Sequence, residues 1–155
     1  MILYLDASAA VKRYVTEPGT AEVLQAIEAS SMVGTGLISR AEIAAALAKA
    51  ARMGALLPGE AEAALETFRV EWPDFIRIQI TEALVARADS LAWQYGLRGY
   101  DAVHLAAALT WQEGIGEPVA LATFDRRLWE SARQSGLLVF PDDSPAMLAA
   151  WSSVR

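Results

Sequence analysis

Short apolar runs alternate with longer segments of helical character along this chain, and this alternation restricts the possible folds more than any other feature. The runs have the length and the aliphatic or aromatic content of buried strands. They cover residues 2–5, 31–36, 75–78, 119–122 and 137–140. Strands separated by helices form a parallel sheet that is covered on both faces. We therefore predict an α/β fold with three layers, α/β/α, around a central parallel sheet of four or five short strands.

The segments between the runs carry helix start and stop signals. Ser39 and Glu42 have the spacing of a capping box, Thr81 is a good N-cap, and Gly54 and Gly96 stand where helices end. Helices are predicted over 7–15, 18–29, 39–53, 58–72, 82–95, 100–111 and 125–133, with a short one in the tail over 146–154. Residues 114–116 (Gly-Ile-Gly) are predicted to form a loop, because they lack the third glycine and the preceding strand of a nucleotide-binding fingerprint.

Length and composition exclude several classes of protein. With 155 residues, 54% of them hydrophobic, we expect one domain spanning 1–155. No cysteine and a single histidine exclude disulfides and a zinc site of thiolates or imidazoles. No basic leader or membrane-length apolar run is found, so we expect a cytoplasmic location. The net charge of −6 argues against binding of nucleic acid through a broad basic face.

Four acids stand at positions where a parallel sheet could bring them together. Asp6 directly follows the first apolar run, and Asp125 follows the run over 119–122 by three residues, which places both at the edge where such sheets bind ligands. Glu42 and Asp101 lie in the first turns of predicted helices. Carboxylates gathered in one crevice need a cation, and oxygen ligands select Mg²⁺ or Mn²⁺. Helix capping explains each acid equally well, so the residues alone leave both interpretations open.

Four short motifs resemble those of a known family. They are LDAS at 5–8, SRAE at 39–42, RGYDAVHLAAA at 98–108 and ATFDRRL at 122–128. In this order they are similar to the acidic motifs of the PIN-domain family, and the length and the GYDAVHLA segment resemble its VapC-type toxins. The resemblance implies that Asp6, Glu42, Asp101 and Asp125 hold Mg²⁺ or Mn²⁺ and are catalytic, and that Ser8 and Thr123 support the first and last acids.

The same resemblance implies an activity and partners. It indicates a PIN-like domain that acts as a metal-dependent endoribonuclease, the toxin of a VapBC-type toxin–antitoxin pair. It also implies a homodimer and a small VapB-like antitoxin, whose C-terminal segment lies in a hydrophobic groove and often sends a basic side chain into the acidic pocket. Two alternatives remain: a catalytically silent PIN-like protein-binding module, and a housekeeping nuclease of the same fold acting on DNA or structured RNA.

Other residues near the acids have both a functional and a structural interpretation. The basic ones either contact flanking RNA phosphates or form solvated and ion-paired helix faces; they are Lys12, Arg13, Arg40, Arg98, Arg126 and Arg127. His104 is predicted to be a packed histidine that bonds the backbone, rather than one that orients a metal-bound water. The tryptophans are predicted to be core or interface anchors; they are Trp72, Trp93, Trp111, Trp129 and Trp151.

Overall fold

A five-stranded parallel sheet forms the centre of the protein in the computed structural model, which describes residues 1–143, 146, 147 and 149. The strand order is β3-β2-β1-β4-β5, and every neighbouring pair is parallel. The strands are β1 Ile2–Leu5, β2 Met32–Gly36, β3 Ile76–Ile78, β4 Val119–Ala122 and β5 Leu138–Phe140. The predicted parallel α/β architecture is confirmed.

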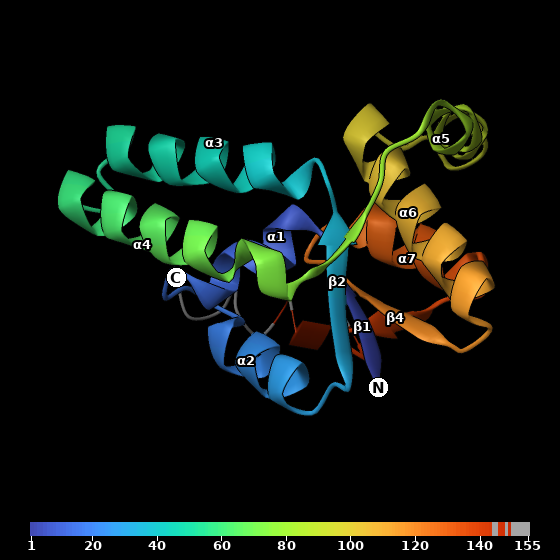
Figure 1. The fold of residues 1–155 in the computed structure, drawn as a ribbon, viewed down its shortest axis with the longest axis horizontal. Helices are drawn as coiled ribbons and strands as arrows, with labels where there is room; N and C mark the ends of the chain where they lie inside the picture. Colours follow the sequence, from blue (N-terminus) through green and yellow to red (C-terminus); the bar gives the residue numbers. More distant parts are fainter. Residues whose placement is uncertain (144–145, 148, 150–155) are drawn as a thin grey trace.

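Helices cover both faces of this sheet (Figure 1). They are α1 Ala7–Ala10, α2 Thr20–Glu28, α3 Ser39–Arg52, α4 Pro58–Glu71, α5 Glu82–Tyr95, α6 Gly99–Ile115 and α7 Arg126–Gln134, with 3₁₀ turns η1 Val11–Arg13 and η2 Trp72–Asp74. Strand β1 shows why both faces are covered. Ile2 and Tyr4 pack on the side of α5, α6 and α7, whereas Leu3 and Leu5 pack on the side of α1, α3 and α4. Successive side chains of a strand point to opposite faces, so a wholly apolar run needs a core on each.

The longest helix, α6, lies against the middle of the sheet because β2 gives it room. A side chain at Gly34 would place its Cβ 2.8 Å from the Trp111 ring, so only glycine allows this approach. Trp72, Trp111 and Trp129 are buried, as predicted for core residues, whereas Trp93 is 92% exposed. Trp151 and most of the helix predicted over 146–154 lie outside the described residues.

Several predicted boundaries were wrong. The helix expected over 7–15 is the short α1 followed by η1, and the one expected from Pro18 begins at Thr20, after Gly19 in the left-handed conformation. Ser39 is not an N-cap, because Ile38 holds that position and the Ser39 hydroxyl bonds the Thr35 hydroxyl at 2.7 Å. The loop predicted at 114–116 is wrong too, since residues 114 and 115 belong to α6 and Gly116 is its C-cap.

Across the described residues, no helix combines the length and the apolar character needed to cross a membrane.

Candidate functional site

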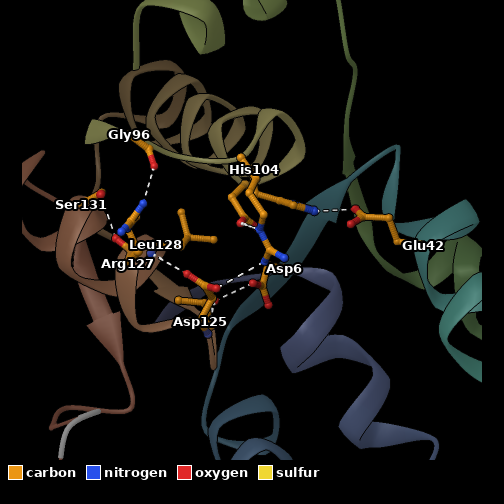
Figure 2. Close-up of polar contacts among 11 residues, drawn as sticks. Asp6, Glu42, Gly96, His104, Asp125, Arg127, Leu128 and Ser131 are labelled. Carbon is orange, nitrogen blue, oxygen red and sulfur yellow. Dashed lines mark hydrogen bonds and ion pairs between the residues drawn. The ribbon is translucent and has the colours of Figure 1, made fainter. Parts of the chain in front are cut away.

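The carboxyl ends of β1 and β4 lie side by side and carry the first and last acids. The two strands pair in parallel, and the backbone N–H of Asp6 extends the pairing by donating to the Ala122 carbonyl at 3.1 Å. Asp125 follows at the N-cap of α7. Glu42 and Asp101 approach from the first turns of α3 and α6. Figure 2 shows Asp6 and Asp125 next to each other, with His104 between Asp6 and Glu42 in this view.

Asp6 is a buried carboxylate held by three donors. Its side chain accepts hydrogen bonds from the Ser8 hydroxyl at 2.7 Å, the Ala9 backbone N–H at 2.9 Å and the Thr123 hydroxyl at 2.5 Å. Burial raises the pKa of Asp6, while the charge of His104 and these hydrogen bonds oppose the rise. The charged form therefore depends on its polar neighbours.

Ser8 and Thr123 also join the turns that follow β1 and β4. The Ser8 hydroxyl accepts from the backbone N–H of Phe124 at 3.1 Å, and the Thr123 hydroxyl accepts from the backbone N–H of Asp125 at 3.1 Å. Each hydroxyl thus donates to Asp6 while it accepts from the segment that carries Asp125. This network fixes the separation of the two acids.

Asp101 and Asp125 share the guanidinium group of Arg98. Arg98 Nε lies 2.9 Å from Asp101 Oδ2, and Arg98 Nη2 lies 3.3 Å from Asp125 Oδ2. Burial raises the pKa of Asp101; Arg98 opposes this rise, and the charge of Asp125 adds to it. The Arg98 side chain is 64% exposed, so water screens these pairs.

Glu42 is bonded to a buried histidine. Its Oε1 lies 2.7 Å from Nε2 of His104, and Nδ1 of His104 lies 2.7 Å from the hydroxyl of Tyr4. The expectation that His104 bonds the backbone was wrong, because both ring nitrogens contact side chains. Tyr4 was missed at the sequence level, where it is only an aromatic residue two positions before Asp6.

Helix capping explains two of the four acids. Asp6 accepts from the Ala9 N–H and Asp125 from the Leu128 N–H, so both are N-caps. Asp101 is not a cap, since Arg98 holds the N-cap position of α6 without a side-chain bond. The Glu42 carboxylate contacts His104, on another helix. The structure therefore gives Asp101 and Glu42 contacts that capping does not account for.

The donor set suits a hard cation, although it is not arranged around one here. Every acid offers carboxylate oxygen, the ligand type of Mg²⁺ and Mn²⁺. Within the described part of the chain, no three Asp, Glu or His side chains are close enough together to hold an ion. The positive charge between Asp101 and Asp125 is instead the Arg98 guanidinium. Arg98 is exposed and reaches both acids from the N-cap position of α6.

The other basic residues mostly have partners away from the acids. Lys12 is buried and contacts Glu17 and the Pro18 carbonyl, Arg13 pairs with Glu71, and Arg126 pairs with Glu130. Arg40 lies over the Trp72 ring and Arg127 donates to the Gly96 carbonyl. A cleft of about 150 Å³ lies beside the acids; it is lined by Gly96, Leu97, Arg98, Asp101, Asp125 and Arg127. Of the predicted RNA contacts, Arg98 and Arg127 line this cleft.

Comparison with known proteins places the chain in a family. A profile of the PIN domain matches residues 3–133. Ribonuclease VapC45 of Mycobacterium tuberculosis (strain CDC 1551 / Oshkosh) is 34% identical over 141 residues, which cover 90% of this chain and 95% of that protein.

Solved structures agree on the fold. A toxin–antitoxin complex from Klebsiella pneumoniae matches with a TM-score of 0.59 at 21% identity, covering 81% of this chain and 87% of that chain. VapBC2 from Rickettsia felis, bound to a DNA fragment from its promoter, matches with a TM-score of 0.60 at 15% identity. The match covers 90% of this chain and 97% of that chain. The chain therefore belongs to the PIN-domain family, within which its sequence is similar to that of VapC proteins.

Proposed function

We propose that this protein is a metal-dependent endoribonuclease, the toxin of a VapBC-type pair, which hydrolyses RNA phosphodiester bonds at Asp6, Glu42, Asp101 and Asp125. The observation that carries the proposal is the set of contacts that links these acids beside the carboxyl ends of β1 and β4. The Thr123 hydroxyl bonds Asp6 and the backbone of Asp125, and Arg98 pairs with both Asp101 and Asp125. Glu42 is joined to α6 through His104. The name of the relative, a ribonuclease VapC, supports the reaction and the kind of substrate.

In this proposal the main role of the four acids is to bind the metal ion. Mg²⁺ or Mn²⁺, when bound, supplies neutralisation of the phosphate charge and a more acidic water. Asp6, with its oxygens fixed by Ser8, Ala9 and Thr123, is the rigid member of the set. Asp101 and Asp125 face the cleft, where the scissile phosphate has room. Arg98, once released from the acids, lies where it can pair with a phosphate of the RNA.

Cleavage of RNA by the purified protein tests the activity. Incubation with a mixed RNA substrate is expected to give discrete fragments with Mg²⁺ or Mn²⁺, and none after the metal is removed with EDTA. A DNA strand of the same sequence separates the RNA nuclease from the DNA-cutting alternative. Cleavage that persists in EDTA contradicts the metal requirement, and no cleavage under any metal condition contradicts the nuclease.

Arg98 gives a prediction about the cation itself. Because its guanidinium competes for Asp101 and Asp125, Arg98→Gln is expected to bind Mn²⁺ about two- to fivefold more tightly than the wild type, an effect the size of an exposed ion pair. Titration calorimetry measures this affinity. Arg126→Gln is the control, since it removes the same charge from a pair with Glu130. Equal affinities of Arg98→Gln and the control contradict competition at the acids.

The proposed partners are a VapB-like antitoxin and a second copy of the chain. A groove of about 340 Å³ between α3 and α4 suits an apolar segment of an antitoxin; it is lined by Leu37, Arg40, Ala41, Ala44, Leu65, Phe68 and Arg69. Structures of toxin–antitoxin complexes with this fold support the antitoxin. The homodimer rests on the family resemblance.

One observation favours a second candidate, the silent protein-binding module. Asp6 and Asp125 cap helices, and Arg98 already balances the charge of Asp101 and Asp125. If these are the only roles of the acids, Mn²⁺ does not stabilise the protein. If the acids form a metal site, Mn²⁺ raises the melting temperature.

A further inference from the structure

We propose that Tyr4 and His104 are positioning residues that hold the Glu42 carboxylate in place for the metal site. This inference rests on the proposed function and deepens it, because it assigns a role to two buried residues that are not themselves acids of the site. The contacts that carry it form one continuous line from Tyr4 on β1 through His104 on α6 to Glu42 on α3.

This chain of hydrogen bonds is buried at the Tyr4 end and partly exposed to solvent at the Glu42 end. Tyr4 is fully buried, His104 is 1% exposed, and the Glu42 side chain is 27% exposed. A glutamate on the surface of a helix samples many rotamers, and ordering it costs free energy. The bond of 2.7 Å to a ring packed in the core restricts Glu42 to one direction. A ligand that is held in advance loses less entropy when an ion binds.

The direction of each hydrogen bond follows from the donors available. A carboxylate only accepts hydrogen bonds, so Nε2 of His104 carries the proton that points to Glu42. The Tyr4 hydroxyl lies 2.7 Å from Nδ1, the other ring nitrogen, and can donate its proton there. The Tyr4 hydroxyl thus occupies the other ring nitrogen and holds the ring with Nε2 facing the carboxylate.

Gly36 leaves the space that this arrangement needs. A Cβ at position 36 would lie 2.7 Å from the Tyr4 hydroxyl oxygen and 3.6 Å from Nδ1 of His104. The first distance is shorter than any ordinary contact, so a side chain there would displace the hydroxyl. An apolar residue at position 4 would fill the same part of the core without requiring a glycine at position 36. The pairing of Tyr4 with His104 is therefore more than core packing.

The experiment measures Mn²⁺ affinity by titration calorimetry in four variants. His104→Leu removes the donor and is expected to weaken binding about tenfold, the lower end of the effect of residues that orient metal ligands. His104→Gln keeps an N–H near the position of Nε2 and is expected to restore most of the affinity. Glu42→Gln weakens binding directly. In the double variant, His104→Leu is expected to add no further loss, since it acts through Glu42.

Tyr4→Phe provides a second route if His104→Leu does not fold. It removes one oxygen, frees Nδ1 of His104 and is expected to weaken Mn²⁺ binding about threefold, a fraction of the loss expected of an orienting residue. Tyr14→Phe is the matched control, because it removes a hydroxyl bonded to another glutamate, Glu71, also at 2.7 Å. The control is expected to bind Mn²⁺ like the wild type.

The outcomes separate this inference from the proposed function. If Asp101→Asn abolishes Mn²⁺ binding while His104→Leu and Tyr4→Phe bind normally, the positioning role is overturned and the metal site stands. The positioning role is also overturned if the loss of Mn²⁺ affinity in the double variant equals the sum of the losses in His104→Leu and Glu42→Gln. If Asp101→Asn binds Mn²⁺ as the wild type does, the metal site itself is wrong.

Discussion

Asp6→Asn is expected to lose RNA cleavage by about 10³-fold in kcat/KM, because the loss of one anionic ligand removes several kcal/mol of transition-state stabilisation. Its fold is expected to persist. Asparagine keeps an oxygen that can accept from the Ala9 N–H and an N–H₂ group that can donate to Thr123, and it removes a buried charge. The melting temperature of the metal-free variant is therefore expected to equal or exceed that of the wild type.

Three variants make this result specific. Asp101→Asn is expected to lose cleavage to a similar extent. Asp6→Ala is expected to lose both cleavage and about 1 kcal/mol of stability, since alanine cannot cap α1. Asp89→Asn removes an exposed carboxylate on α5 and is expected to cleave like the wild type. Cleavage by Asp6→Asn at the wild-type rate, with the fold intact, contradicts the assigned role.

The sequence predicted the features of the fold that depend on local signals. Apolar runs marked the strands, and the parallel arrangement followed from the helices between them. That arrangement sufficed to place Asp6 and Asp125 at one edge, because the ends of parallel strands meet there. The strand order itself was not predicted, since nothing in a short apolar run specifies its neighbour.

The contacts of the site depend on residues far apart in sequence. His104 lies three positions after Asp101 on the same helix, yet its partners Glu42 and Tyr4 lie 62 and 100 positions away in the sequence. Ser39 shows how tertiary contacts override a local rule. Its spacing to Glu42 fits a capping box, but the Thr35 hydroxyl binds Ser39 and the His104 ring binds Glu42, so neither side chain caps α3.

The site carries unfavourable electrostatics that a divalent ion would relieve. Asp6 and Asp101 both have a raised pKa, caused first by burial, so each is held in its charged form at a cost in free energy. Arg98 offsets part of this cost for Asp101, and His104 together with hydroxyl and amide donors offsets part of it for Asp6. Sites that sacrifice stability in this way are commonly functional.

Asp6 and Asp101 are expected to make the metal-free protein less stable as the pH rises, and Mn²⁺ is expected to offset this contribution. A carboxyl whose folded-state pKa is raised contributes stability that is fully present below the ordinary value of 3.8 and is lost as the pH rises through the folded value. At neutral pH both acids are therefore destabilising. An ion at 100 times its dissociation constant adds about 2.7 kcal/mol, which corresponds to about 5 to 10 °C in melting temperature.

The measurement compares the wild type with Asp6→Asn across pH, because Glu71 and Glu113 contribute in the opposite direction to both proteins. Their pKa values are lowered by hydrogen bonds to Arg13 and Arg87, so they add stability above the ordinary value of 4.5. The difference in melting temperature between the two proteins therefore reports on Asp6. Asp6→Asn is expected to become more stable relative to the wild type as the pH rises, and its melting temperature is expected to change little with Mn²⁺. A wild type that melts at the same temperature with and without Mn²⁺ indicates that the acids are caps and ion-pair partners, which favours the silent module.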